Sequence, residues 1–209
     1  MTMRAPDSAA GHAGRKVKAV LAGGLVLGIG AAVTLASWND SEFATGTFGA
    51  GHFDVQGSSD GTTFANHASS GAAAALAFSA GFDSMSPSDT TAAPFALRLD
   101  KDTSYNATVS VNSAAVSGSA ATKLTYRIVA VGSVAACTPS AAGSGTIVPA
   151  GTALDSVTAA TTFELTPSTN PGVDPGAAAV LCIQVTAAPS LVQGSSAVGT
   201  WEFLASSHG

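Results

Sequence analysis

The chain has 209 residues, which is enough for one domain of ordinary size but too few for two large domains and a linker. Charged residues make up 10% and apolar residues 46% of the sequence, a balance that disfavours both intrinsic disorder and a coiled coil. Beyond residue 20 only four basic residues stand against twelve acids, and this excess of negative charge argues against nucleic acid or anionic lipid as a partner.

An export signal is expected at the N-terminus. Basic residues cluster at 15–18 and precede an uncharged, mostly apolar run at 20–36, the order found in secretory signals. A permanent membrane anchor is the alternative, because a run of 17 residues lies at the lower limit for spanning a bilayer. Glycines within the run and the small Ala36 at its end favour cleavage. We therefore expect 1–36 to be a cleaved signal peptide, so that only the precursor meets the membrane.

The stretch T-L-A-S-W-N-D-S-E-F-A-T-G-T-F at 34–48 carries a resemblance. It is similar to the start of TasA/camelysin-like proteins, whose precursors are processed by a SipW-type signal peptidase. The resemblance implies cleavage between Ala36 and Ser37. A second stretch, 83–99, is similar to the Pro-Gly-Asp turn that precedes a strand in this family, with Ser88 in place of the glycine.

Beyond residue 37, short apolar runs separated by Gly, Pro, Ser and Asp predict strands and turns. The Gly-Ser-Ser-Asp-Gly sequence at 57–61 matches the G-x-S-x-G nucleophile elbow of hydrolases, which needs a strand before the serine and a helix after it. Residues 53–56 could supply the strand, but Thr62, Thr63 and Phe64 favour a second strand, so we expect a hairpin turn. The alanine-rich run at 70–78 suggests a helix.

Strict alternation then predicts two half-buried antiparallel strands, with Phe95, Leu97 and Leu99 inward in the first and Tyr105, Ala107, Val109 and Val111 inward in the second. Further strands are expected at 123–131 with Leu124, Tyr126 and Ile128 inward, at 163–165, at 180–186, and at 198–204 with Trp201 and Phe203 on one face. Low-complexity stretches at 113–121 and 140–145 are expected to be loops. The spacing of these strands predicts an all-β, antiparallel two-sheet sandwich. The resemblance implies that the sandwich is of jelly-roll type, with the signal helix at 1–36, an N-terminal segment at 37–55 and the sandwich domain at 56–209.

The two cysteines, Cys137 and Cys182, both lie in the exported part and are expected to form a disulfide. The alternative, a catalytic cysteine, would need an unpaired thiol and a positioned imidazole base.

The camelysin branch is classed with metallopeptidases, yet the sequence has no H-E-x-x-H motif. The mature glutamates are dispersed, and His52 and His67 lie in Gly/Ser-rich surroundings without a nearby Glu, so we expect exposed histidines and no catalytic residue, metal or cofactor. A metal assembled from distant positions stays an alternative. The spacing of Asp100 and Asp102 matches part of an EF-hand calcium loop, but the glycine and the bidentate glutamate of that loop are missing here. We expect a turn at the end of a strand, with weak calcium binding as the alternative.

The resemblance implies a secreted structural protein of the cell surface, a subunit of biofilm-matrix type fibres. A freed N-terminal strand can complete the open sheet edge of a neighbouring subunit, and head-to-tail donation builds a filament. The expected donor residues are Trp38, Phe43, Phe48, Phe53 and Val55. Alternatively, this segment is the first strand of its own sandwich. The expected partners are a SipW-type signal peptidase, further copies of the chain, and cell-wall or matrix components, with no nucleic acid. A camelysin-like surface metallopeptidase and a monomeric wall-associated module are the alternative functions.

Overall fold

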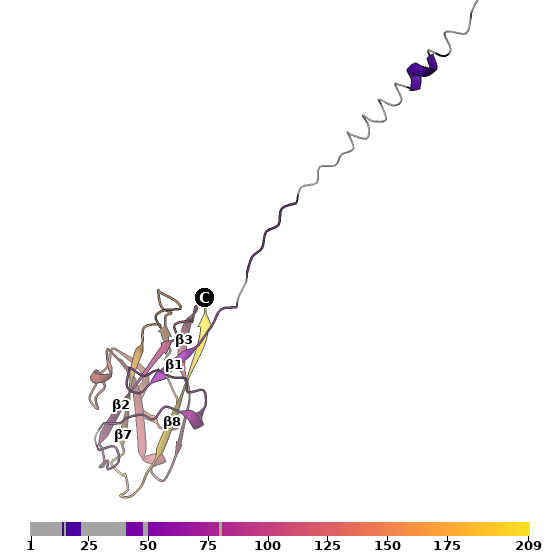
Figure 1. Ribbon diagram of the computed structural model, residues 1–209. Helices are drawn as coiled ribbons and strands as arrows, with labels where there is room; N and C mark the ends of the chain where they lie inside the picture. Colours follow the sequence, from indigo (N-terminus) through magenta and orange to yellow (C-terminus); the bar gives the residue numbers. More distant parts are fainter. Residues whose placement is uncertain (1–13, 15, 22–40, 48–49, 80) are drawn as a thin grey trace, which may run out of the picture. The chain divides into compact units, whose positions relative to one another are not determined.

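The computed structural model describes residues 14, 16–21, 41–47, 50–79 and 81–209, and it divides into two compact units, 1–48 and 49–209 (Figure 1). Residues 16–21 of the first unit are helical and lie within the expected signal helix at 1–36, and most of the apolar run lies outside the described residues. Within these described ranges, no helix has both the length and the apolar character needed to cross a membrane. All of the strands that the structure describes belong to the second unit.

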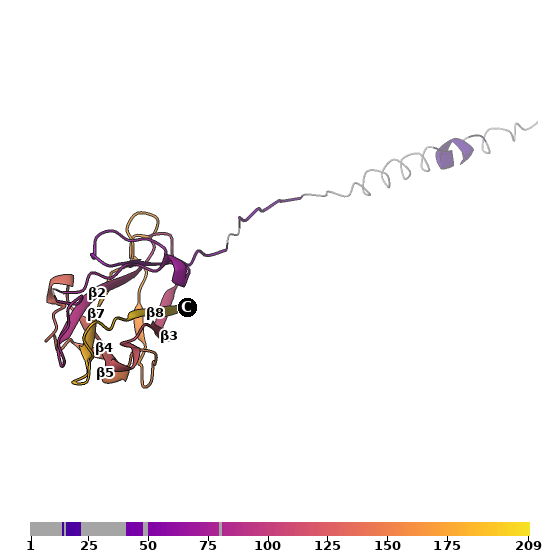
Figure 2. The same ribbon diagram turned by 90° about the horizontal axis from the view of Figure 1, so that it is seen from below.

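Two antiparallel sheets form the second unit and confirm the expected β-sandwich. One sheet has five strands in the order β1-β2-β7-β4-β5 and the other has three in the order β6-β3-β8; the two layers separate clearly in Figure 2. The strands are β1 (Val55–Ser58), β2 (Thr90–Leu99), β3 (Asn106–Ser117), β4 (Leu124–Val131), β5 (Gly145–Ala153), β6 (Phe163–Leu165), β7 (Ala179–Ala187) and β8 (Val198–His208). Three short 3₁₀ turns are η1 (Ser70–Ala72), η2 (Ala121–Lys123) and η3 (Val134–Ala136).

The core lies between the two sheets, where alternate side chains of each strand meet. The expected inward residues that are buried in β2 and β3 are Phe95, Leu97, Leu99, Ala107, Val109 and Val111. Two aromatic pairs join the sheets: the ring centroids of Phe95 in β2 and Phe203 in β8 are 5.4 Å apart, and those of Tyr126 in β4 and Trp201 in β8 are 5.6 Å apart. The inward orientation expected for Trp201 and Phe203 is therefore confirmed.

The strand β2 differs from the expected half-buried strand because both of its faces are covered. Ala92 and Ala96, on the face away from the main core, are 2% and 0% exposed. Ala92 belongs to a second, smaller apolar cluster with Val129 and Cys182. The covering residues Cys137 and Ala141 come from the loop between β4 and β5, so this loop forms a partial third layer.

The prediction of a helix at 70–78 is wrong. Only η1 is helical, and beyond it alternate side chains of the non-helical segment, Ala74, Leu76 and Phe78, pack against the main core. The helix propensity of alanine is a weak preference, and here the burial of every second side chain overrides it.

Other local expectations also need correction. The strand β3 continues through Ser117, which pairs with Val198 of β8, so the first half of the expected loop at 113–121 is strand. Tyr105 precedes β3 and is 42% exposed rather than inward. The strand β5 was not expected at all.

The turn before β2 adopts the backbone conformation that its sequence suggests. The amide of Asp89 donates to the carbonyl of Ser86 at 3.1 Å, with Pro87 and Ser88 at the two central positions. Ser88 has φ of 71°, a left-handed conformation that favours glycine. The serine therefore occupies a position at which a glycine, as in the Pro-Gly-Asp turn, would be unstrained.

Candidate functional site

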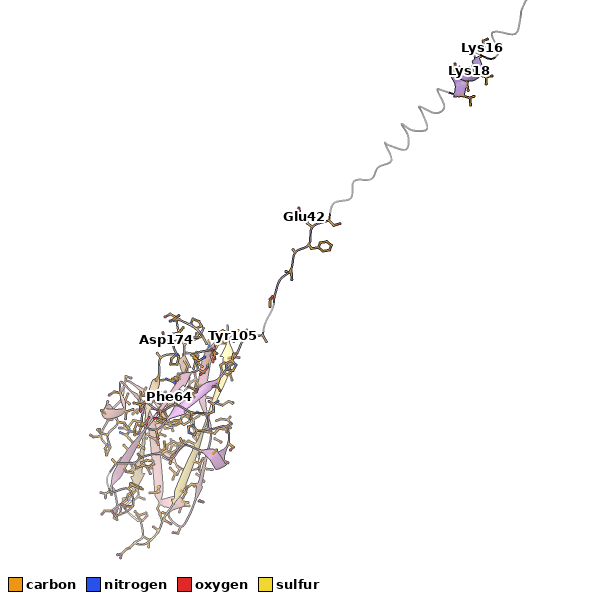
Figure 3. All side chains as sticks on the ribbon, in the orientation of Figure 1. Lys16, Lys18, Glu42, Phe64, Tyr105 and Asp174 are labelled. Carbon is orange, nitrogen blue, oxygen red and sulfur yellow. A yellow bond between two sulfur atoms is a disulfide. The ribbon has the colours of Figure 1, made fainter. Side chains whose placement is uncertain are left out.

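The described part of the N-terminal segment is exposed and has no regular secondary structure. All of residues 41–47 are exposed, and Figure 3 labels Glu42 within this stretch. The side chain of Phe43 is 96% exposed, and full burial of such a side chain would stabilise an assembly by about 2–3 kcal/mol. The expected cleavage and donor residues that lie outside the described ranges are Ala36, Ser37, Trp38 and Phe48.

Phe53 and Val55 belong to the sandwich itself. The domain boundary that was expected after Val55 therefore lies earlier in the chain. Val55 begins β1 and pairs with Leu99 of β2, and both Phe53 and Val55 pack against the main core. The compact unit already begins at Gly49. The last part of the expected donor segment is thus the first strand of the chain's own sheet, and only the residues before Gly49 are left as a donor.

The strand β8 is a long open edge. It pairs with β3 over its whole length, and no strand of the described part of the chain lies on its other side. Among the described residues, no backbone hydrogen bond joins 198–208 to any segment other than β3. The strand contains no proline, and Val198 and Leu204 are 67% and 47% exposed. Such an edge presents unpaired backbone groups to which another strand can be added.

The other sheet edges are less suited to accept a strand. At the edge of the larger sheet, β5 contains Pro149, its pairing with β4 is interrupted by register shifts, and Gly151 has φ of 81°. Proline and bulges protect an edge because they remove donors and twist the strand. The remaining edges, β1 and β6, are only four and three residues long. The edge of β8 is therefore the best candidate surface for strand addition.

The expected disulfide is confirmed. Cys137, which follows η3, is bonded to Cys182 in the centre of β7, and the side chain of Cys182 is fully buried. Neither sulfur is a free thiol. The bond holds the loop between β4 and β5 against the outer face of the larger sheet.

Two polar side chains that the sequence analysis did not identify hold the same loop. Gln184 of β7 is 1% exposed, and its Nε2 donates to the carbonyls of Thr138 at 2.7 Å and Ala141 at 3.0 Å. Arg127 of β4 donates through Nη2 to the carbonyl of Ala141 at 2.6 Å and through Nε to Oε1 of Gln184. A hollow of about 240 Å³ borders both side chains. Because these polar groups already bind the loop, we assign the hollow no ligand.

The Gly-Ser-Ser-Asp-Gly sequence forms a turn, as expected, and not a nucleophile elbow, but in place of the second strand expected at 62–64 the structure has an isolated bridge between Gly57 and Ala65. Gly57 and Ala65 exchange backbone hydrogen bonds of 2.9 and 3.0 Å, and no helix follows β1 at this point. The carboxylate of Asp60 accepts from the amides of Thr63 and Thr62, both at 2.7 Å. These two hydrogen bonds, helped by the Ser58 hydroxyl, lower the pKa of Asp60 below its usual range. The Ser58 hydroxyl, which also accepts from the amide of Gly61 at 2.9 Å, thus serves the turn.

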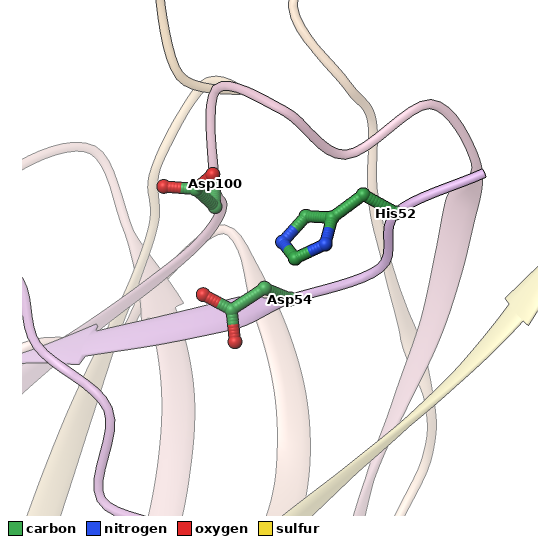
Figure 4. A group of neighbouring side chains, drawn as sticks. All are labelled: His52, Asp54 and Asp100. Atoms are coloured by element: carbon green, nitrogen blue, oxygen red, sulfur yellow. The ribbon is translucent and has the colours of Figure 1, made fainter. Parts of the chain in front are cut away.

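Three side chains that can bind a metal ion meet where β1 faces the end of β2. His52, Asp54 and Asp100 each offer a ligand atom, and these atoms all lie within 4.8 Å of one another. Figure 4 shows the imidazole turned toward both carboxylates. His52 and Asp100 lie in separate sequence patterns, and nothing in the local sequence indicates that they meet. Asp102, the other acid of the expected calcium-loop fragment, instead pairs with Lys101 at 2.7 Å.

The backbone around this cluster is firmly held. The amide of Asp54 donates to Oγ1 of Thr103 at 3.0 Å, and that hydroxyl donates to the carbonyl of Asp54 at 3.1 Å. The amide of Asp100 donates to the same carbonyl at 3.0 Å. The amide of Asp102 donates to the Asp100 carboxylate at 3.0 Å and lowers its pKa, an effect to which the charge of Lys101 and the nearby His52 contribute. Asp100 is therefore held in its charged form.

The other histidines and glutamates of the sandwich lie in separate surroundings. His67 is not exposed as expected: it is half-buried, and its Nδ1 is buried without a hydrogen-bond partner among the described residues. Nε2 of His208 is 2.9 Å from Oε2 of Glu164, and this contact lowers the pKa of Glu164. Glu202 accepts hydrogen bonds from Asn112 and Ser113 beside the irregularity in β3. None of these residues takes part in the His52 cluster.

No family model and no curated protein sequence matches the chain.

Proposed function

We propose that the chain is an exported structural protein, the subunit of extracellular or cell-surface fibres of the biofilm-matrix type, assembled through its mature N-terminal segment. The observation that carries this proposal is the open edge of β8, which is eleven residues long and makes backbone hydrogen bonds on one side only within the described part of the chain. In this proposal the sandwich is of the jelly-roll type found in TasA-like proteins.

Secretion is supported by the disulfide and by the N-terminal sequence. A buried disulfide forms and persists in oxidising surroundings, outside the cytosol. The basic cluster and apolar run at 15–36 fit a signal peptide, and the residues that follow resemble a SipW-type processing site. We infer cleavage between Ala36 and Ser37, which gives the mature chain a free N-terminus.

Assembly would then proceed by strand addition. The segment at 37–48 supplies an extended strand whose backbone pairs with β8 of the next subunit, while its aromatic side chains are buried there. Phe43, which is 96% exposed, is the described residue with the most to gain from this burial. Each subunit uses one surface to donate and another to accept, so the contact does not close and a filament grows.

Signal removal acts as the assembly switch in this proposal. A precursor whose N-terminus is held in the membrane cannot insert that end into a neighbouring subunit. Cleavage therefore releases the donor segment and sets the place and time of polymerisation.

Substitution of Phe43 tests the proposal most simply. Phe43→Asp should abolish filaments, because burial of the segment would carry an unpaired charge into the interface. Phe43→Leu, which stays apolar, should retain them. Val192→Asp is the matched control, since Val192 is 64% exposed and lies in the loop before β8. Sedimentation and electron microscopy give the filament yield, and circular dichroism checks the fold; an equal yield from Phe43→Asp would contradict the proposal.

A peptide of residues 37–48 tests the acceptor surface. Added in excess to Phe43→Asp subunits, it should shift the amide NMR signals of 198–208 and leave those of the other long edge, 145–153, unchanged. A scrambled peptide is the control. Shifts confined to 145–153, or no saturable shift at all, would contradict the assignment of β8 as the acceptor.

A further inference from the structure

We propose that His52, Asp54 and Asp100 form a binding site for a divalent first-row transition-metal ion, of which Zn²⁺ fits the donor set best. One imidazole nitrogen and two carboxylate oxygens are ligands that Zn²⁺ takes in proteins. Ca²⁺ and Mg²⁺ prefer oxygen ligands alone, so the histidine favours the transition metal. This inference is independent of the proposed fibre assembly.

The three side chains are close enough for one ion to bind them together. Their ligand atoms lie within 4.8 Å of one another. Two ligand atoms on one tetrahedral zinc ion are about 3.4 Å apart, so small side-chain rotations close the difference. Among the described residues, no hydrogen bond or ion pair joins the His52 ring to either carboxylate, so such a contact does not compete with metal binding.

The register of the strands places two negative charges opposite each other. Val55 pairs with Leu99, and the next residues outward, Asp54 and Asp100, continue this pairing, as the 3.0 Å bond from the Asp100 amide to the Asp54 carbonyl shows. Like charges at directly opposed positions destabilise a sheet. In the described part of the chain, no Lys or Arg forms an ion pair with either carboxylate. A bound divalent cation would neutralise this repulsion.

The site is also preorganised by its surroundings. Thr103, which is 1% exposed, ties the backbone of Asp54 to the loop that follows β2. The same loop is joined to His52, whose carbonyl accepts from the amide of Ser104 at 3.3 Å. Nε2 of Gln56 donates to Oδ2 of Asp100 at 3.2 Å. Outer hydrogen bonds of this kind orient metal ligands and commonly change affinity by about 10–100-fold.

Metal binding would fix the point at which the N-terminal segment enters the sandwich. His52 and Asp54 precede β1, whereas Asp100 follows β2, so one ion would link the two chain segments. Three protein ligands leave a fourth position on a tetrahedral ion open to water. The first expected effect is a gain in stability, because an ion that binds only the folded chain raises Tm.

Metal titration of the chain beginning at Ser37 tests the site. This chain keeps every strand that the structure describes, and it carries Phe43→Asp so that the proposed fibre assembly does not interfere. After the removal of bound metal and at pH 7.5, isothermal titration with ZnCl₂ and with CaCl₂ measures stoichiometry and Kd, and elemental analysis counts the zinc retained. We expect one Zn²⁺ per chain and, at 100-fold excess over Kd, a rise in Tm of about 5–10 °C. His52→Ala, Asp54→Asn and Asp100→Asn should each weaken binding at least tenfold.

Asp102→Asn is the matched control, because Asp102 lies in the same loop as Asp100 but pairs with Lys101. It should bind zinc like the unchanged chain, and NMR spectra of each variant without metal should show the same fold. The site would be refuted by the absence of saturable 1:1 zinc binding, by unchanged affinity in His52→Ala or Asp100→Asn, or by an equal loss in Asp102→Asn. Tighter binding of Ca²⁺ than of Zn²⁺ would overturn the assignment to a transition metal.

Discussion

Removal of the cross-link between Cys137 and Cys182 should lower the free energy of unfolding by about 4 kcal/mol. The two residues are 45 positions apart, and the loss of loop-closure entropy in the unfolded chain gives this magnitude. For a chain of this size, the corresponding fall in Tm is about 8–16 °C. Replacement of both residues by alanine is the appropriate change, because Cys182 is fully buried and a serine would place a hydroxyl group there.

The structure also predicts what survives this change. Gln184 and Arg127 still bind the carbonyl of Ala141, so the loop between β4 and β5 should stay docked and the native spectrum should persist. Urea denaturation of the double-alanine variant and of the reduced and oxidised unchanged chain measures the difference. The reduced chain should match the double variant. A loss below about 1 kcal/mol, or two free thiols in protein purified without reductant, would refute the reasoning.

The turns provide two further predictions. Ser88→Gly should raise the free energy of unfolding measured by urea denaturation by about 1 kcal/mol, because glycine relieves the strain at φ of 71°. The control Ser84→Gly, at a residue without positive φ, should lower the free energy of unfolding. A loss of stability in Ser88→Gly would contradict this reasoning. The amides of Thr63 and Thr62 lower the folded-state pKa of Asp60, so its contribution to stability should be complete above about pH 4 and lost as the pH falls further. Carbon NMR titration of the Asp60 carboxyl checks this, and a midpoint near pH 4 would show that the hydrogen bonds have no such effect.

The fold could be predicted where burial follows the period of the strand. The run at 107–111 alternates cleanly because one face of β3 meets the core. At 95–99 the inward residues were also expected correctly, although Ala96 on the opposite face is buried as well. The strand β5 gave no such signal, since its buried residues Ile147 and Val148 are adjacent and Pro149 and Gly151 interrupt the pattern. The prediction of a helix at 70–78 was wrong because the alanines there favour a helix, whereas the extended conformation depends on tertiary packing against the core.

The candidate site was harder to predict than the fold. His52 and Asp54 lie nearly fifty residues from Asp100, and the pairing register of β1 with β2 is what brings them together. That register depends on which strands become neighbours, a property that the local sequence does not contain. The disulfide, in contrast, could be predicted from the sequence, because the chain has two cysteines and both lie in the part that is expected to be exported. Gln184 and Arg127 could not be foreseen, because their partners are backbone carbonyls of an irregular loop.

Electron microscopy of the chain that begins at Ser37, beside a chain that retains additional residues before Ser37, tests the central claim most directly. If the mature N-terminal segment is the donor strand, filaments should form from the chain with the native N-terminus and not from the extended one. Monomers from both chains under the same conditions would contradict fibre assembly and favour a wall-associated module. Filaments of equal yield from both would contradict signal removal as the switch.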